Sequence, residues 1–308
     1  VLAGNGKIYC APQYATQVLE IDPYYKDIDN AIQLIGNDLG ERGGKYETSV
    51  YSDPAKGGNG KIYCAPSRAT QVLEIDPDAL RKNGIDVNPT VRPTTQLIGT
   101  VITDEIWGGY SKYLTSVLAG NGKIYAIPFN HKIVLEIDPD TGNTTPIDTN
   151  LLKDGYGRGK YTTSVLAGNG KIYAVPCDEA RQVLEIDPET STTKLIGDDL
   201  GEYVGDKYTT SVLAGNGKIY CAPHSTTHVL EIDPETSTTK LIGEKYDGIR
   251  KYSTSILAGN GNIYAAPYGY EDSAVQVLEI DFNQDSICNT KPELCLVNNH
   301  SSIFYGKD

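Results

Sequence analysis

Three of the four histidines and many acidic side chains lie in short variable segments that could hold a ligand or a metal ion. The histidines are His131, His224 and His228, and the last two could help to bind a transition metal. Carboxylates in comparable segments could supply the hard oxygen ligands of a calcium ion. The acidic candidates are Asp178, Glu179, Asp198, Asp199, Glu271 and Asp272. The alternative is that polar loops on an acidic protein are solvated and bind no metal.

Aromatic residues occur in the same variable segments. They are Tyr14, Trp107, Tyr110, Tyr268 and Tyr270. An aromatic ring combines a flat apolar face with a polar edge, which suits a sugar ring or a protein partner. The alternative is that these rings pack within their own loops. Together with the three histidines they are the predicted ligand-binding residues, and no residue is assigned a catalytic role.

The variable segments are set between copies of one repeat. The string Gly-Asn-Gly-(Lys/Asn)-Ile-Tyr occurs six times, with its asparagines at Asn5, Asn59, Asn121, Asn169, Asn216 and Asn260. Each copy is followed by Val-Leu-Glu-Ile-Asp, and five copies are preceded by Lys-Tyr-x-Thr-Ser. Units of four short strands at roughly 40–50 residues per repeat are typical of propeller blades.

One repeat shows where the strands are expected. Within residues 160–197 we predict strands at 161–167, 171–175, 182–187 and 192–196, here named a, b, c and d. An Asn-Gly turn joins a to b, and an Asp-Pro turn joins c to d because proline sets the φ angle. The chain is therefore predicted to be all-β, a six-bladed β-propeller with four antiparallel strands per blade. Residues 1–308 form one domain in this prediction, with blades at approximately 1–44, 45–110, 111–159, 160–206, 207–250 and 251–308.

Strand direction alternates within a blade, so the b–c and d–a loops share one face of the propeller. These loops differ from blade to blade, which predicts that ligands bind on this face. The lysines of the Lys-Tyr-x-Thr-Ser segments enter the innermost strand and could ring the mouth of the channel. They are Lys45, Lys112, Lys160, Lys207 and Lys251. Such a ring could hold an anion, but the sequence favours pairing with the acidic d–a loops.

Other repeated residues are predicted to be structural. If Tyr9 faces Val18 across the b–c hairpin, Lys7 faces Glu20, and five blades can form this pair on a solvated face. The tyrosines of the Ile-Tyr pairs are expected to pack between blades, and the aspartates before the c–d turns to cap them. Among the cysteines, Cys10 and Cys64 are predicted to be free and buried, and Cys288 and Cys295 form the one plausible local disulfide.

The net charge of −13 argues against nucleic acid as a partner. No apolar run approaches the ~18 residues of a membrane helix, so membrane insertion is not expected. The chain begins at Val1 and contains no methionine, which indicates a processed chain or a fragment. With glycosylation sequons at Asn143 and Asn299, this predicts an extracellular or secreted glycoprotein.

The repeat units also carry a family resemblance. Gly170–Pro176 reads Gly-Lys-Ile-Tyr-Ala-Val-Pro, and Val183–Thr190 reads Val-Leu-Glu-Ile-Asp-Pro-Glu-Thr. Such units resemble the NHL/YVTN-like group of β-propellers over nearly the whole chain. The resemblance implies the fold and says little of function, because propellers serve as enzymes, lectins and docking platforms. No family catalytic residue can be transferred to this chain.

Two functions are compatible with these features. The sequence favours a secreted, non-enzymatic binding or assembly module that presents variable loops to a protein or glycan partner. A homo-oligomer or a structural part of an extracellular assembly belongs to the same class. The alternative is a metal-dependent hydrolase or lactonase that uses Ca²⁺ on the b–c/d–a face, although no Ser-His-Asp order or nucleophile elbow is present. Ca²⁺ is the cofactor that the sequence suggests first, and a transition metal at His224 and His228 is the alternative.

Overall fold

A computed structural model describes residues 1–27, 31–78, 81–82, 85–86, 93–102, 111–147, 159–201, 205–269 and 276–282. The chain divides into two compact units, Val1–Tyr203 and Val204–Asp308, and each is described by itself. The one helix that lies wholly within the described residues is a short 3₁₀ turn at Pro54–Lys56, and the other elements with defined bounds are β-strands. No helix in the described ranges is long and apolar enough to cross a membrane.

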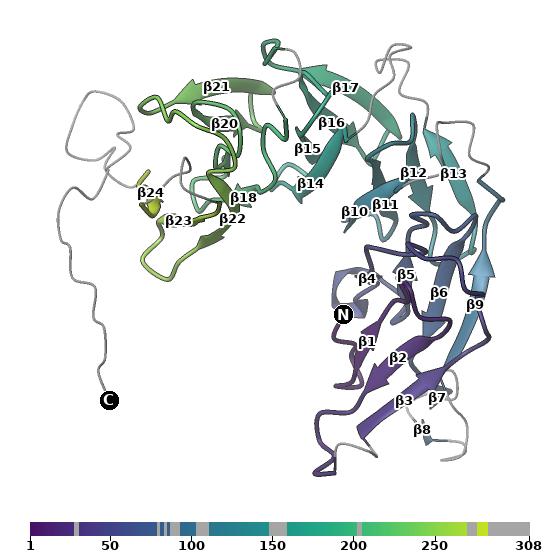
Figure 1. The fold of residues 1–308 in the computed structure, drawn as a ribbon. Coiled ribbons are helices and arrows are strands. Elements are labelled where there is room, and N and C mark those ends of the chain that lie inside the picture. Colours follow the sequence, from purple (N-terminus) through teal and green to yellow (C-terminus); the bar gives the residue numbers. More distant parts are fainter. Residues whose placement is uncertain are drawn as a thin grey trace, which may run out of the picture. The chain divides into compact units, whose positions relative to one another are not determined.

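The first unit contains four antiparallel sheets, each built from strands that follow one another along the chain (Figure 1). Blade 1 consists of β1 (Ile8–Cys10), β2 (Val18–Ile21) and β3 (Ile32–Ile35). Blade 2 consists of β4 (Val50–Tyr51), β5 (Ile62–Cys64), β6 (Val72–Asp76) and β9 (Thr94–Ile98), with a small hairpin of β7 (Arg81–Lys82) and β8 (Ile85–Asp86) inserted before β9. Blade 3 consists of β10 (Tyr113–Leu118), β11 (Ile124–Pro128), β12 (Val134–Ile137) and β13 (Thr144–Ile147). Blade 4 consists of β14 (Tyr161–Leu166), β15 (Ile172–Pro176), β16 (Val183–Asp187) and β17 (Thr192–Ile196).

The second unit contains two further sheets of the same kind. Blade 5 consists of β18 (Val212–Leu213), β19 (Ile219–Cys221), β20 (Val229–Asp233) and β21 (Thr238–Ile242). Blade 6 consists of β22 (Tyr252–Leu257), β23 (Ile263–Pro267) and β24 (Leu278–Ile280). Six sheets of three or four antiparallel strands confirm the predicted blade count, and the strands predicted for blade 4 are correct to within a residue at each end.

Turn chemistry joins the strands as the sequence predicts. In blade 4, the backbone N–H of Lys171 donates to Asn169 Oδ1 over 3.0 Å, and Gly170 has a φ of +81°, so the Asn-Gly pair closes the a–b turn. At the other turn of this blade, Asp187 Oδ1 accepts from the backbone N–H of Glu189 over 3.0 Å. The same cap forms at Asp22, Asp76, Asp138 and Asp233.

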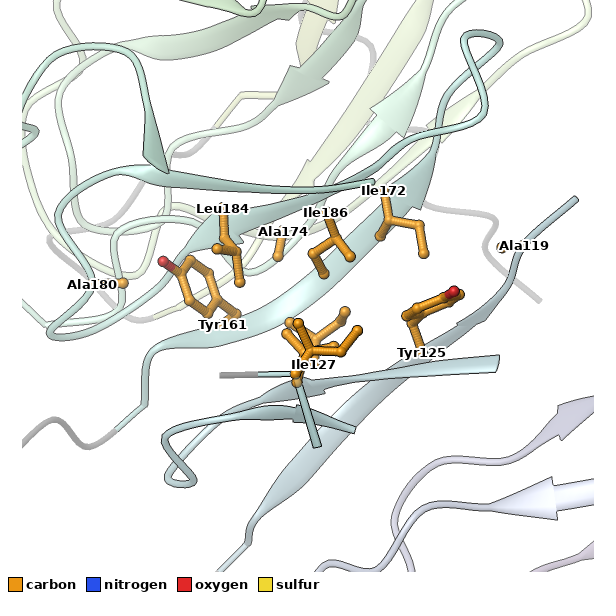
Figure 2. Close-up of a cluster of buried hydrophobic side chains, with 11 residues drawn as sticks. Ala119, Tyr125, Ile127, Tyr161, Ile172, Ala174, Ala180, Leu184 and Ile186 are labelled. Atoms are coloured by element: carbon orange, nitrogen blue, oxygen red, sulfur yellow. The ribbon is translucent and has the colours of Figure 1, made fainter. Parts of the chain in front are cut away.

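The hydrophobic core lies between consecutive blades. In Figure 2, Tyr125 and Ile127 of β11 face Ile172 and Ala174 of β15. Strands b and c of blade 3 are buried on both faces because this sheet packs between blades 2 and 4. Strand d of blade 4 is exposed or half-buried except at Ile196.

A hydrogen-bonded joint fastens each blade to the next within the first unit. At the joint between blades 3 and 4, Asn121 Nδ2 donates to Tyr125 Oη and to the carbonyl oxygen of Pro188, over 3.0 Å in each case. Tyr125 Oη lies 3.2 Å from the same carbonyl. Equivalent joints link Asn5 to Pro77 and Asn59 to Pro139. The predicted packing of the Ile-Tyr tyrosines between blades is therefore confirmed.

The predicted Lys–Glu pairs form, but not in the predicted register. The strands pair Tyr9 with Glu20 rather than with Val18, so the alignment differs from the prediction by two residues. Lys7 Nζ reaches Glu20 diagonally over 2.7 Å. The four other predicted pairs are 2.6–2.8 Å long. The expectation of a solvated face is wrong for the carboxylates, because the five glutamates are only 1–6% exposed.

The cysteines differ in exposure because the blades differ in strand number. Cys10, Cys64 and Cys221 are free thiols, as predicted for the first two. Cys64 is buried, whereas Cys10 is exposed, so the prediction of burial is wrong for Cys10. In blade 1 the inner edge of β1 is paired only with residues 1–3, through the bridge from Leu2 to Ile8 and the main-chain hydrogen bonds between Val1 and Tyr9. No described strand covers this edge at Cys10. Cys288 and Cys295 lie outside the described residues.

Candidate functional site

The b–c and d–a loops lie on one face of each blade, as predicted. The backbone N–H of Leu39, in the first d–a loop, donates to the carbonyl of Thr16 in the b–c loop over 2.8 Å. Blade 4 repeats this bond from Leu200 to Arg181 over 2.8 Å. The opposite face collects the a–b and c–d turns, since Asn59 of one turn binds Pro139 of the other in the next blade. The variable loops of neighbouring elements are therefore held together on a single surface.

The Lys-Tyr segments anchor this loop-bearing face. In the first unit, the backbone of Lys112 donates to the carbonyl of Ser67 in the preceding blade over 3.0 Å and accepts from Phe129 of its own blade over 2.8 Å. Lys160 in turn donates to the carbonyl of Phe129 over 2.8 Å. Each lysine backbone thus links two consecutive b–c loops. Main-chain hydrogen bonds through Lys45, Lys112 and Lys160 therefore connect all the b–c loops of the first unit.

The second unit contains the same arrangement. The backbone N–H of His224 donates to the carbonyl of Lys207 over 3.0 Å, and Lys251 donates to the carbonyl of His224 over 2.9 Å. Tyr268 then donates to the carbonyl of Lys251 over 2.6 Å. His224 and Tyr268, two predicted ligand-binding residues, are therefore placed on either side of Lys251.

The residue before four of these lysines has a left-handed backbone. Gly44 and Gly159 have φ angles of +72° and +63°, and glycine accepts this conformation without steric strain. Ser111 and Arg250 adopt it with φ angles of +42° and +55°. A side chain at such a position costs about 1–2 kcal/mol relative to the ordinary conformation. Arg250 is therefore a functional candidate that the sequence analysis did not single out, although the glycines at equivalent positions were a visible signal.

The five repeated lysine side chains are buried, with exposed fractions of 0–6%. Lys45 Nζ donates to the carbonyl of Arg42 over 2.7 Å, and Lys251 Nζ donates to the carbonyl of Gly248 over 2.6 Å. These two lysines therefore bond to the d–a loops, as the sequence favoured, but the acceptors are backbone oxygens and not carboxylates. Burial lowers the pKa of Lys160 and of Lys251 to about 8.

The three predicted histidines are held by local hydrogen bonds. His131 Nδ1 lies 3.0 Å from Tyr113 Oη, and His228 Nδ1 lies 2.8 Å from Thr227 Oγ1. His224 is 6% exposed, with Nδ1 at 3.1 Å from the carbonyl oxygen of Asp206. Burial lowers the pKa of His224, so its ring is largely neutral at pH 7. The predicted joint role of His224 and His228 in metal binding stays a prediction.

Two of the predicted aromatic residues are described, and both are exposed. Tyr14 is 71% and Tyr268 is 52% accessible to solvent. Tyr14 packs over the d–a loop, where a Cβ added to Gly43 would lie 2.6 Å from its ring. The Tyr268 ring lies beside His224, with centroids 6.0 Å apart. Trp107, Tyr110 and Tyr270 lie outside the described residues.

The acidic candidates that are described do not form a metal cluster. Asp199 makes an ion pair with Arg181 over 2.7 Å, while Asp198 and Glu179 are exposed. The backbone N–H of Asp178 donates to the carbonyl of Gly159 over 2.7 Å, next to the start of β14. In the described part of the chain, no three histidine, cysteine, aspartate or glutamate residues come together as a metal site. Glu271 and Asp272 lie outside that part, so the calcium prediction is not settled.

The predicted glycosylation sites are divided in the same way. Asn143 is exposed in the c–d turn of blade 3, where its carbonyl accepts from the backbone N–H of Asp138 over 2.9 Å. This places it on the face opposite the variable loops. Asn299 lies outside the described residues.

No protein-family model matches the chain, and no curated protein matches it. Solved structures do resemble it. The virginiamycin B lyase of Staphylococcus aureus, solved with quinupristin as a catalytically inactive variant, has a TM-score of 0.59 at 12% identity, over 92% of this chain and 80% of that chain. A streptogramin B lyase has a TM-score of 0.56 at 13% identity, over 91% and 78% of the two chains. The extracellular domain of a one-component system from B. thetaiotaomicron has a TM-score of 0.53 at 12% identity, over 87% of this chain and 32% of that chain.

At these identities the likeness establishes the fold alone. The chain has the six-bladed β-propeller fold, with three or four antiparallel strands in each described blade. The activities of the lyases and the location of the extracellular domain belong to those proteins.

Proposed function

We propose that this chain is a non-enzymatic binding module that works outside the cell and captures a glycan or protein with the b–c and d–a loops. The observation that carries this proposal is the set of main-chain hydrogen bonds by which the repeated lysines link consecutive b–c loops. It fixes loops of different sequence on one repeated scaffold, which is how binding loops are usually presented. The extracellular domain among the similar structures supports the proposed location.

The chemistry of the described side chains is consistent with binding. The lysines, the histidine Nδ1 atoms and the Ile-Tyr tyrosines are engaged in holding the scaffold. The side chains exposed on the loop face include aromatic rings such as Tyr14 and Tyr268 and charged groups such as Asp198. Exposed aromatic rings on rigid loops bury apolar area against a ligand at a small loss of conformational entropy.

The test is a glycan array with a pull-down from extracellular material, followed by two matched double variants. Tyr14→Ser with Tyr268→Ser removes exposed rings from the loop face, and we expect binding of any captured ligand to weaken at least tenfold, about 1.4 kcal/mol. Tyr24→Ser with Tyr25→Ser removes rings that are 82% and 58% exposed from the c–d turn face and serves as the control.

Two outcomes would overturn the proposal. One is a ligand whose binding depends on Tyr24 and Tyr25 but not on the loop-face tyrosines. The other is hydrolysis of lactones or esters that requires a bound metal ion, measured as turnover with and without a chelator.

A further inference from the structure

Four side chains of the second unit come together where blades 5 and 6 present their loops. His224 lies in the b–c loop of blade 5, Arg250 and Lys251 enter β22, and Tyr268 follows β23. The main chain fixes their order, since Lys251 donates to the carbonyl of His224 and accepts from Tyr268. Figure 1 shows β22 and β23 side by side in blade 6. Adjacent main-chain positions therefore carry an exposed ring, an exposed guanidinium and a buried ammonium.

Arg250 occupies this site at a conformational cost. Its φ of +55° is the left-handed conformation for which Gly44 and Gly159 stand at the equivalent positions of blades 2 and 4. A glycine would fit better, yet the chain carries a long cationic side chain that is exposed. The guanidinium makes no hydrogen bond or ion pair with any part of the chain that is described. Strained residues of this kind gather at functional sites.

Lys251 adds a second positive charge beneath the surface. It is 1% exposed, and within the described residues its ammonium group makes one hydrogen bond, from Nζ to the carbonyl of Gly248 over 2.6 Å. An ammonium group has three N–H donors, so two of them have no acceptor in the described residues. The nearest exposed carboxylate on the same loop, Asp247, is already paired with Lys245 over 2.7 Å.

We propose that Arg250, Lys251 and Tyr268 form a binding site for an acidic sugar, meaning a sugar ring that carries one carboxylate or one sulfate. The inference rests on the proposed binding function and specifies its ligand class. The guanidinium offers a planar fork of donors that matches a carboxylate or sulfate. The half-exposed Tyr268 ring supplies the apolar face for the sugar, and the buried Lys251 charge strengthens the positive potential at this point.

The charge of the whole molecule limits the ligand further. A net charge of −13 repels polyanions, so a nucleic acid or a long sulfated polysaccharide is disfavoured by the long-range field. A short glycan that ends in one acidic sugar meets the local positive site without that penalty. An acidic peptide could use the same two cations, but it does not require the aromatic ring.

The experiment is isothermal titration calorimetry of the whole chain with two acidic disaccharides, cellobiouronic acid and 6-sulfated cellobiose. Cellobiose, which has no charge, is the control. We expect the acidic forms to bind at least tenfold more tightly than cellobiose. Arg250→Gly should remove that preference while leaving the melting temperature unchanged or raised, because glycine relieves the left-handed strain. Ser111→Gly relieves the same strain in blade 3 and should leave binding unchanged. Arg250→Gln keeps a side chain without its charge and should bind like Arg250→Gly.

The two acidic probes distinguish a carboxylate ligand from a sulfate ligand. Equal binding of cellobiose and its acidic forms overturns the inference. The proposed binding function survives that result if binding is still lost in Tyr14→Ser with Tyr268→Ser. An Asp-rich peptide that binds more tightly than either acidic sugar, and does so equally well to Tyr268→Ser, would show that the site recognises protein instead. Full retention of the acidic preference in Arg250→Gly would also contradict the assignment.

Discussion

Each joint between blades in the first unit depends on one buried tyrosine hydroxyl. Tyr125 Oη accepts from Asn121 and lies within 3.2 Å of both the Pro188 carbonyl and Glu136 Oε2. Ser191 of blade 4 also donates to Glu136 over 2.9 Å. The hydroxyl therefore connects a turn, a charged pair and the next blade, and a buried polar group of this kind stabilises the fold only while every partner is present.

Replacing this hydroxyl should be measurable. We expect Tyr125→Phe to lower the free energy of unfolding by about 1–2 kcal/mol, because the Pro188 carbonyl and the Asn121 amide lose a buried partner. The measurement is denaturant unfolding followed by circular dichroism. Tyr24→Phe removes a hydroxyl from a ring that is 82% exposed and should change stability by less than about 0.5 kcal/mol. Equal losses in the two variants would contradict the role of the joint.

The buried lysines predict a pH dependence with a definite sign. The pKa of Lys251 falls from 10.5 to about 8 in the folded protein because burial disfavours the ammonium. The unfolded chain therefore binds this proton more tightly than the folded chain, and the charged lysine destabilises the fold below about pH 8. Lys251→Met should raise the free energy of unfolding at pH 7 by about 1–2 kcal/mol.

This gain should diminish as the pH rises from about 8 towards 10.5, because the folded wild type is then neutral at Lys251 and the free energy needed to remove the proton from the unfolded chain falls. The measurement is the free energy of unfolding of the wild type and of Lys251→Met at pH 7, 8, 9 and 10. A gain that stays constant over this range would show that the variant acts through packing and not through charge.

At the scale of single elements, the sequence predicted strands better than it predicted their alignment. Asn-Gly and Asp-Pro turns mark the ends of strands a to d, and the strands of blade 4 fall within a residue of the prediction. The b–c hairpin has no such marked turn, so its register was placed two residues away from the observed pairing of Tyr9 with Glu20. Burial of Glu20 could not be foreseen, because the sequence does not show which strand positions neighbouring side chains cover.

The candidate site was predictable in its face but not in its details. Variation among the b–c and d–a loop sequences predicted this face, and His224 and Tyr268 do lie together there. The role of Arg250 depends on its left-handed φ angle, which the sequence does not show for an arginine. The carbonyl acceptors of Lys45 and Lys251 were equally hidden, since backbone oxygens have no signature in a sequence.

The uncovered edge of β1 gives a prediction for an element. Cys10 is exposed there, whereas Cys64 and Cys221 at the same position of other blades are buried, and burial raises the pKa of the Cys64 thiol to about 12. In a Cys288→Ser, Cys295→Ser background, we expect an aromatic disulfide reagent to label Cys10 within seconds to minutes and the other thiols only on unfolding. Labelling of all four at one rate would contradict the burial, and protection of Cys10 would show that another strand covers this edge.

At the scale of the whole molecule, the repeated blades are equivalent in sequence but differ in the number of strands that the described residues form. Within the first unit, blade 3 has four paired strands and neighbours joined to it on both sides, while the described part of blade 1 has three strands. Local opening follows the number of buried contacts and paired edges. We expect backbone amides of β11 and β12 to exchange hydrogen at least about tenfold more slowly than those of β1 and β2, which corresponds to about 1.4 kcal/mol of opening free energy. Mass spectrometry of peptides after exchange in heavy water measures this difference. Equal protection of the two blades would mean that the edge of β1 is closed by chain outside the described residues, and the fold would then behave as a uniform set of six blades.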